Sequence, residues 1–365
     1  MGVEAEQTTP TESPIDQLQK LSTTNRLAEM EANLSNSEYI VLDMALSGQV
    51  TLFFAAPNTG KTLLMIWFLI DAFKRGVINP ADVFYINADD HYAGVVQKTR
   101  IAKQYGFHMI SPAEAHLTPK DILELLEQMA LSSEAKGKVF ILDTLKKFAD
   151  MMNKNSQANL YETLRRLVAQ NATVILLGHT NKHADADGNL IYEGTSDTLN
   201  DVDCAYAIYR MREKHSDEMV VEFRNEKDRG SVVRKVSYGY QQAEGMTYQE
   251  RLDSIYRLSD SDAKAAAKQA KVEQTKERFE SEILFIRDAL KDGPLNQSQV
   301  LSRYTKADGE GLASEVSKNS LKQCLDALQG IEWEVARDRI GNNAKKFSLK
   351  NGTSYQRAKW GEHDF

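Results

Sequence analysis

Cysteine and long apolar runs are scarce in this chain of 365 residues. Its two cysteines, Cys204 and Cys324, lie far apart, which excludes a disulfide framework and a cysteine-based zinc cluster and predicts two buried free thiols. The longest apolar run, residues 63–70, is far shorter than a membrane span. The N-terminus carries neither the basic flank nor the apolar core of a signal peptide. We therefore expect no membrane partner and a cytoplasmic location.

An excess of positive charge is also missing. The formal net charge of -7 argues against a wholly basic surface that coats nucleic acid. Nucleic acid binds local basic patches, however, so a basic channel stays open. With 42% hydrophobic residues, the chain is long enough for one large domain and a smaller one.

Composition divides the chain into segments. Residues 1–37 predict a flexible tail that ends in a weakly helical pattern from Leu18 to about Leu34, which suits either an arm docking on a neighbouring subunit or an amphipathic cap. In residues 38–258, short apolar runs alternate with helical stretches, which predicts an α/β domain whose mostly parallel, doubly wound sheet is covered on both faces. Residues 259–280 are rich in Ala, Lys and Glu, which indicates a charged helical linker.

The C-terminal part predicts a small separate domain. Residues 281–352 show three short helical patterns and then two strands around a turn at residues 341–343. That order fits a winged helix, and a generic small α/β appendage is the alternative. The helix that begins near Lys318 would face a DNA groove, although docking of a protein is equally open. Residues 353–365 are expected to be a tail.

The segment AAPNTGKT, residues 55–62, lies between the apolar runs VTLFF and LLMIWFLI. A phosphate-binding loop joins a strand to a helix, and its backbone N–H groups, a lysine and a hydroxyl hold phosphates and magnesium. Lys61 and Thr62 supply the last two groups, so ATP and Mg²⁺ are the expected cofactors. Ala55 replaces the usual opening glycine, and we expect it to adopt the left-handed turn conformation at a tolerable cost of roughly 1–2 kcal/mol. The residues expected to contact the nucleotide are Ala56, Pro57, Asn58, Thr59, Gly60, Lys61 and Thr62.

Acidic residues follow two of the predicted strands. The run VFILDT places Asp143 at the carboxyl edge of a buried strand, where a Walker B carboxylate helps Thr62 to hold Mg²⁺ through water. An aspartate that only caps the next turn is the alternative. The run VFYINADD ends in Asp89 and Asp90, and one of them is a candidate catalytic base.

In this order, the motifs resemble the RecA-like ATPases, and within them the ring-forming RepA and DnaB-type replicative helicases. The resemblance covers about residues 38–234. It implies that Asp89 is the catalytic base, with a side chain one methylene shorter than the family's usual glutamate. In ILLGHTNKH it implies that His179 senses the γ-phosphate and that Asn181 and Lys182 follow it. A structural role is the alternative for a histidine in this place.

Two further segments resemble the same family. In EGTSDTLNDVDCAYAIYR, Asp203 matches the acid that opens the next strand. FRNEKDRG resembles the Lys-x-Arg hairpin with which one subunit reaches the nucleotide of its neighbour, and Lys227 and Arg229 match it. The resemblance thus implies a homo-oligomer, a hexamer in ring helicases. A solvated basic turn is the alternative.

The resemblance also implies that single-stranded DNA runs through the ring, held by the loops after the Walker B and sensor strands. Acids such as Glu193 oppose this role in the second loop, so a plain flexible connection is the alternative. Phe148 or Tyr192 either stacks on a base or is buried. The residues expected to bind DNA phosphates are Lys146, Lys147, Lys154, Lys182 and His183.

The expected function is a ring-forming DNA helicase or translocase, driven by hydrolysis of Mg-ATP in DNA replication, with a loader or initiator protein as a further partner. The alternative is a RecA-like ATP-dependent switch that regulates replication, repair or transcription without unwinding DNA. The missing glycine at Ala55 and the short Asp89 side chain favour the switch. The Lys227 and Arg229 pair favours the motor.

Overall fold

The chain divides into two units in the computed structural model. The first consists of Met1–Arg210 and Asp217–Leu258, and the second of Met211–Ser216 and Ser259–Phe365. Both cysteines are buried free thiols, as expected. Within the described residues, no helix has the length and apolar character needed to cross a membrane. The structure describes residues 13–33, 38–132, 134–150, 153–181, 190–193, 197–211, 217–309, 316–337 and 344–350.

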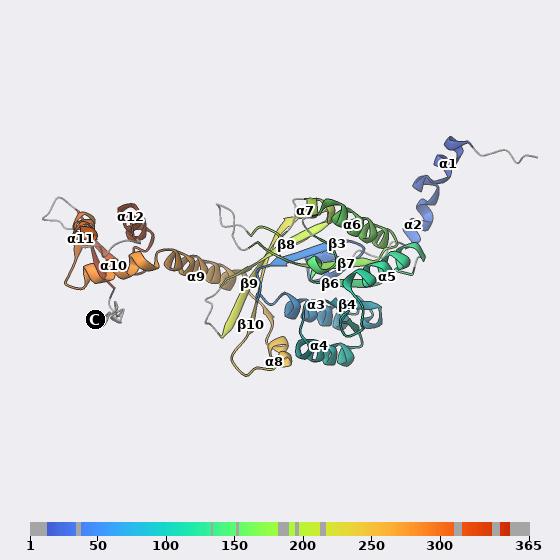
Figure 1. Ribbon diagram of the computed structural model, residues 1–365, viewed down its shortest axis with the longest axis horizontal. Helices are drawn as coiled ribbons and strands as arrows, with labels where there is room; N and C mark the ends of the chain where they lie inside the picture. The colour runs from blue at the N-terminus through green and yellow to red at the C-terminus, as the bar shows by residue number, and fades with distance from the viewer. Residues whose placement is uncertain are drawn as a thin grey trace, which may run out of the picture. The chain divides into compact units, whose positions relative to one another are not determined.

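The first unit is built on a nine-stranded mixed sheet (Figure 1). In order across the sheet, its strands are β11 (Tyr256–Arg257), β10 (Lys235–Gln241), β9 (Glu218–Lys227), β8 (Cys204–Arg210), β3 (Val50–Ala55), β7 (Thr173–His179), β6 (Val139–Asp143), β4 (Val83–Asn87) and β5 (His108–Ile110). From β8 to β5 neighbouring strands are parallel, whereas β9, β10 and β11 are added antiparallel. A short hairpin of β1 (Tyr39–Val41) and β2 (Ala45–Leu46) precedes the sheet.

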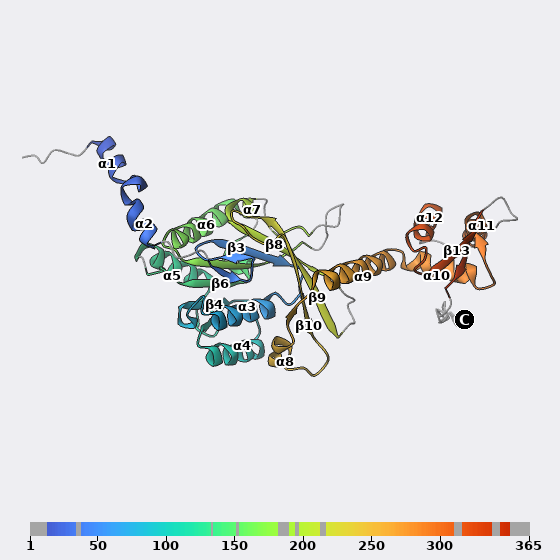
Figure 2. The ribbon, with the colours of Figure 1, turned by 180° about the vertical axis from the view of Figure 1, so that it is seen from behind.

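Helices cover both faces of this sheet (Figure 2). Residues of α3 (Lys61–Arg75), α4 (Tyr92–Tyr105) and α8 (Tyr248–Asp253) pack in one apolar core. Residues of α5 (Pro119–Ser132), α6 (Lys154–Ala169) and α7 (Asp197–Asp201) pack around the core on the other face. Because both faces are covered, every residue of β3 and β6 is buried. The α/β class and the mostly parallel sheet are therefore confirmed.

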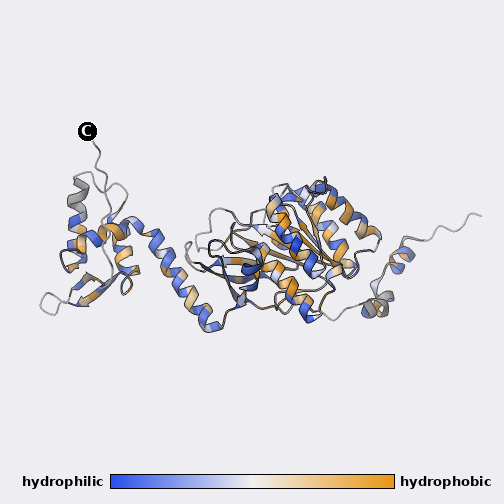
Figure 3. Ribbon diagram, turned by 90° about the horizontal axis from the view of Figure 1, so that it is seen from below, coloured by the Kyte–Doolittle hydropathy of each residue, from blue (hydrophilic) through white to orange (hydrophobic). Residues whose placement is uncertain are grey.

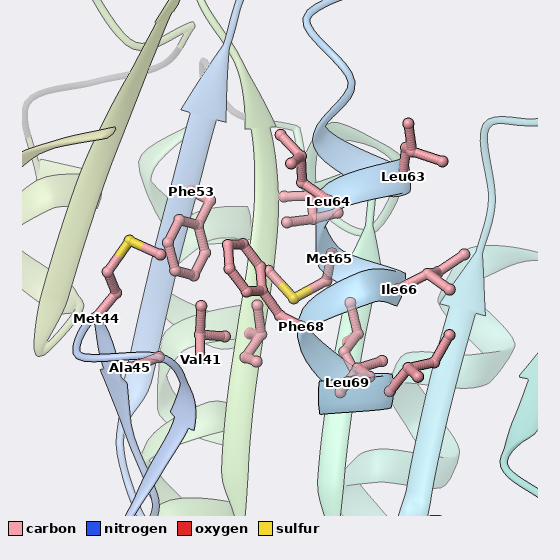
Figure 4. Close-up of a cluster of buried hydrophobic side chains, with 14 of the residues drawn as sticks. Val41, Met44, Ala45, Phe53, Leu63, Leu64, Met65, Ile66, Phe68 and Leu69 are labelled. Atoms are coloured by element: carbon pink, nitrogen blue, oxygen red, sulfur yellow. The ribbon is translucent and has the colours of Figure 1, made fainter. Parts of the chain in front are cut away.

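Helix α3 is held by apolar side chains on most of its circumference. Phe68 packs edge-on against Phe223, and Phe53 of β3 lies beside it in the same cluster (Figure 4). Glycines in the left-handed conformation flank the helix, Gly60 before its first residue and Gly76 after its last. The first turn of α3 is thus fixed directly at the carboxyl end of β3.

Two short 3₁₀ turns and an N-terminal helical segment complete the first unit. The turns are η2 (Pro80–Asp82), before β4, and η3 (Leu145–Lys147), after β6. The helical pattern expected before residue 38 is broken into α1 (Pro14–Lys20), η1 (Thr23–Arg26) and α2 (Leu27–Asn33). Its apolar side chains, such as Leu18 and Leu21, are exposed. Residues 1–12 of the expected tail lie outside the described residues.

The C-terminal stretch of the second unit begins with α9 (Asp260–Arg278), which occupies the expected helical linker. This helix is mainly hydrophilic (Figure 3) and buries Ala266 alone among its described residues. After it come α10 (Glu280–Leu290), β12 (Leu295–Asn296), α11 (Gln297–Gly309), α12 (Lys318–Ala327), β13 (Trp333–Arg337) and β14 (Lys345–Leu349).

The strands of the second unit form one antiparallel sheet in the order β12-β14-β13. Trp333 and Phe347 are buried in a core shared with the three helices α10, α11 and α12. Three helical patterns and two strands were expected here, and the short strand β12 is an addition. The expected turn at residues 341–343 and the tail at 353–365 lie outside the described residues.

Candidate functional site

The connection from β3 to α3 is formed by residues 56–60. Ala55 is the last residue of β3, so the expectation that it adopts a left-handed turn is wrong. Instead, Asn58 and Gly60 take positive φ angles of 60° and 81°. Asparagine and glycine tolerate this conformation far better than alanine. The chain therefore turns after Ala55, and the alanine carries no strain of this kind.

Gly60 fits its place for a second reason. A side chain at this position would collide with the hydroxyl of Tyr240 on β10. The hydroxyl of Thr59 donates to the carbonyl of Ala56 at 2.6 Å, which closes the loop. The backbone before α3 is thus held in one tight conformation, as a loop that presents N–H groups to an anion requires.

Lys61 begins α3 and lies under the loop with only 9% of its surface exposed. Its Nζ donates to the carbonyl of Ala55 at 3.4 Å and lies 3.3 Å from Nδ1 of His179. Burial lowers the pKa of Lys61, and the negative charges of Asp143 and Asp89 only partly oppose that shift. The ammonium group is therefore short of compensating negative charge, which a phosphate would supply.

Thr62 and Asp143 meet where α3 begins and β6 ends. The Thr62 hydroxyl donates to Oδ2 of Asp143 at 2.7 Å, and the hydroxyl of Tyr85 donates to the same oxygen at 2.7 Å. Asp143 is 5% exposed. Burial raises its pKa, although the two hydroxyl donors and the charge of Lys61 oppose the shift. A nearby cation would compensate this buried carboxylate.

These donors fit Mg²⁺. A hydroxyl and a carboxylate are hard oxygen ligands, and Mg²⁺ at a nucleotide site takes one or two of them together with phosphate oxygens and water. No group of three His, Cys, Asp or Glu side chains that could hold a metal occurs among the described residues. Thr62 and Asp143 thus suit a cation that arrives with its own oxygen ligands.

The sequence left open which of two carboxylates faces this site, and their partners distinguish them. Oδ2 of Asp90 accepts from Nδ2 of Asn87 at 2.7 Å and pairs with Lys98 on α4. Oδ2 of Asp89 lies 3.6 Å from Nε2 of His179, the histidine beside Lys61. Asp89 therefore belongs to the cluster around the loop, and Asp90 is bound to α4.

His179 is the last residue of β7 and links Lys61 to Asp89. Burial lowers its pKa, and the positive charges of Lys61 and Lys146 lower it further against the effect of Asp89. The neutral imidazole is thus favoured, with one nitrogen facing an ammonium and the other a carboxylate. After it, the backbone N–H of Asn181 donates to the carbonyl of Ile191 at 2.8 Å.

The lysines expected to bind DNA are only partly described. Nζ of Lys147 lies 3.5 Å from Oδ1 of Asp89, and Nζ of Lys146 lies 3.7 Å from Oε2 of Glu193. Lys154 is the first residue of α6, and Lys182 and His183 lie outside the described residues.

Two aromatic residues beside these lysines had two open interpretations. Phe148 and Tyr192, expected either to stack on a base or to be buried, are both buried. Tyr192 packs edge-on against Phe54 of β3, with ring centroids 5.7 Å apart. Neither ring is exposed for stacking on a base in this conformation.

The other residues expected at a nucleotide lie at the opposite edge of the sheet. Asp203 precedes β8, and its Oδ2 accepts from the backbone N–H of Val50, where β3 begins, at 3.0 Å. Its Oδ1 accepts from Arg229 at 3.0 Å and from Arg165 of α6 at 2.7 Å. Nζ of Lys227 donates to two carbonyls at the end of α7.

The length of β3 separates this edge from the loop. A strand of six residues rises about 3.3 Å per residue, so about 16 Å lies between its ends. The structure consequently does not bring Lys227 and Arg229 to the loop of their own chain. Arg165 and Tyr85 were missed by sequence reasoning, since a helix arginine and a tyrosine in an apolar strand carry no local signal of their partners.

At the carboxyl edge, in contrast, five predicted residues come together: Lys61, Thr62, Asp89, Asp143 and His179. They derive from four separate elements, β3–α3, β4, β6 and β7. Comparison with known proteins adds no family: no protein-family model matches the chain, and a search of curated proteins finds no similar sequence.

Proposed function

We propose that this chain is a RecA-like P-loop ATPase that binds ATP with Mg²⁺ and works as a ring-forming DNA helicase or translocase in replication. The observation that carries the proposal is the bond from the Thr62 hydroxyl to Asp143, with Lys61 beside it at the junction of β3 and α3. Burial disfavours the charged forms of Lys61 and Asp143, and a phosphate beside Lys61 and Mg²⁺ beside Asp143 would compensate these charges.

The proposal gives each residue one task. Backbone N–H groups of residues 56–60 and the ammonium of Lys61 bind the phosphates, and Thr62 and Asp143 hold the Mg²⁺. The cation, when bound, neutralises charge on the phosphate oxygens. Asp89 orients the attacking water and takes its proton, and His179 contacts the γ-phosphate.

The place of Lys227 and Arg229 supports assembly into a ring. Since about 16 Å separates them from the loop of their own chain, any contact they make with a nucleotide is to one held by another copy. In this proposal that copy is a neighbour in a homo-oligomer, a hexamer by resemblance. An arginine supplied from a neighbouring subunit makes hydrolysis depend on assembly.

The proposal also assigns partners. Lys146, Lys147 and Lys154, with the sequence-predicted Lys182 and His183, bind single-stranded DNA phosphates along the ring. The three helices and antiparallel strands of the second unit support a winged-helix domain, which would dock DNA or a protein such as a loader or initiator.

The test is ATP hydrolysis together with strand displacement on a forked DNA duplex. The parent chain is expected to do both. Lys61→Ala is expected to lose roughly 100-fold or more of the turnover, since it removes the ammonium group that neutralises the phosphates. Lys74→Ala, at the exposed end of α3, is a matched control that keeps the activity.

The outcomes separate the possible functions. Failure of the folded parent chain to bind ATP would overturn the proposal entirely. ATP hydrolysis without displacement, also in the presence of a loader, would favour the switch. One observation already points in that direction, because Asp89 is engaged by both His179 and Lys147.

A further inference from the structure

The candidate base Asp89 is held by a lysine that is expected to bind DNA. Lys147 lies in η3, the turn that follows β6, and its ammonium is 3.5 Å from Oδ1 of Asp89. His179 faces the other oxygen. Both carboxylate oxygens thus have a nitrogen neighbour that competes with a water molecule at the nucleotide.

A second ion pair joins the same turn to the sensor strand. Lys146 lies 3.7 Å from Oε2 of Glu193, whose backbone N–H donates to the carbonyl of His179 at 2.9 Å. The two neighbouring lysines of η3 therefore each face an acid that is bound to, or in contact with, His179. A ligand that binds both lysines must therefore displace Asp89 and Glu193 from them.

These pairs are exposed enough for a ligand to compete. The side chains of Lys147 and Asp89 are 45% and 41% exposed, and exposed ion pairs contribute little net stability. A strand of nucleic acid offers several phosphates in a row, which bind such lysines cooperatively with the rest of the strand. Exchange of the carboxylate for a phosphate keeps each lysine paired with one negative charge.

From this geometry we propose that Lys147 couples the binding of single-stranded nucleic acid to ATP hydrolysis. Without the strand, Lys147 holds Oδ1 of Asp89 and turnover is slow. When the phosphates of the strand pair with Lys147, Asp89 is released and orients the water. The inference rests on the proposed ATPase function, and it assigns Lys147 as a positioning residue for the base.

The chain contains a matched ion pair for control. Lys138 and Asp82 precede β6 and β4, and they form an ion pair across the amino ends of these two strands. Lys147 and Asp89 follow the same two strands and bridge their carboxyl ends. Lys138→Ala thus removes a lysine that bridges the same strands, at the edge remote from the nucleotide.

The experiment measures steady-state ATP hydrolysis by the full chain, with and without saturating single-stranded oligothymidylate. The parent chain is expected to be stimulated by the DNA. Lys147→Ala is expected to raise the DNA-free kcat several-fold and to leave the KM for ATP unchanged. DNA should then no longer stimulate hydrolysis. Lys147→Arg restores the charge and the low DNA-free rate, and Lys138→Ala behaves like the parent.

Three results separate failure of the inference from failure of the function on which it rests. If the parent hydrolyses ATP but Lys147→Ala keeps the DNA-free rate and the stimulation ratio, the coupling is refuted and the ATPase stands. A fall of the DNA-free rate in Lys147→Ala would also refute it, because Lys147 would then assist catalysis. If the parent does not hydrolyse ATP, the proposed function itself is refuted.

Discussion

The two edges of the nine-stranded sheet are both rich in charged groups, but they differ in how the charges are compensated. At the carboxyl edge, burial moves the pKa of Lys61 down, that of Asp143 up and that of His179 down. Each shift favours the neutral form, so the partners of these groups compensate their charges only in part. Such poorly compensated groups are typical of sites that are completed by a ligand.

At the amino edge the central acid is well compensated. Burial alone would raise the pKa of Asp203, but the bonds from Val50 and Arg165 and the charges of Arg165 and Arg229 outweigh it and lower the pKa. Lys227 differs, because burial and then the charge of Arg229 lower its pKa. Asp203 thus stabilises the edge as a well-compensated charge, whereas the charged form of Lys227 is disfavoured.

The largest effect is expected for Arg229→Ala, which tests whether the amino edge has more than a structural task. If Arg229 reaches the nucleotide of a neighbouring subunit, turnover falls about 1,000-fold or more, while ATP affinity stays close to that of the parent. The side chain is 52% exposed and Arg165 still pairs with Asp203, so the free energy of unfolding should change by only about 1 kcal/mol.

The measurement is kcat at saturating ATP, with ATP binding and thermal unfolding recorded on the same samples. Arg224→Ala is a useful comparison, because Arg224 of β9 also pairs with a buried acid, Glu222, at 2.6 Å. Unchanged turnover of Arg229→Ala in the assembled protein would reduce the amino edge to a structural role and remove the support for a ring.

A loss of roughly 100- to 1,000-fold in turnover is expected for Asp143→Asn at the carboxyl edge. The amide oxygen can still accept from Thr62 and Tyr85, but the charge that holds Mg²⁺ is removed. Since burial raises the pKa of Asp143, its ionised form is costly in the fold. The free energy of unfolding should therefore stay the same or rise.

Thermal or urea unfolding without nucleotide checks the second half of this prediction. A clear loss of stability in Asp143→Asn would mean that the carboxylate is compensated as well as Asp203. Tyr85→Phe sharpens the comparison, because it removes one donor to Oδ2 and leaves the charge in place. It should lower turnover less than Asp143→Asn does.

Most of the sheet and the loop could be predicted from local sequence. The apolar runs that form β3, β4, β6 and β7 are short, continuous and bounded by polar residues, because strands buried on both faces need apolar side chains at every position. The glycine, lysine and threonine of the loop and the position of Asp143 after its strand are likewise local features.

Partners between distant elements could not be predicted. Whether Asp89 or Asp90 faces the loop depends on Asn87 and Lys98, which bind Asp90, and no spacing in the sequence fixes that choice. The conformation of Ala55 was predicted wrongly because the turn was assigned to the position of the missing glycine. In the structure, Asn58 and Gly60 make the turn.

The smallest effect, on stability alone, is expected for Asp203→Asn. One amide oxygen cannot serve the Val50 N–H and both arginines, and the new NH₂ group faces donors. Loss of such a hydrogen-bonded buried charge should lower the free energy of unfolding by about 2 to 3 kcal/mol. The measurement is urea unfolding of the parent and Asp203→Asn side by side at neutral pH.

The pH dependence of that difference tests its cause. The pKa of Asp203 lies below its ordinary value of 3.8 in the folded chain, so its contribution to stability is present above pH 3.8 and is lost as the pH falls through the lower, folded pKa. The difference between parent and Asp203→Asn should therefore be constant near neutral pH and shrink in acid. A difference that persists unchanged below this pKa would instead come from the shape of the new side chain, and the amino edge would then owe its stability to packing rather than to the paired charge.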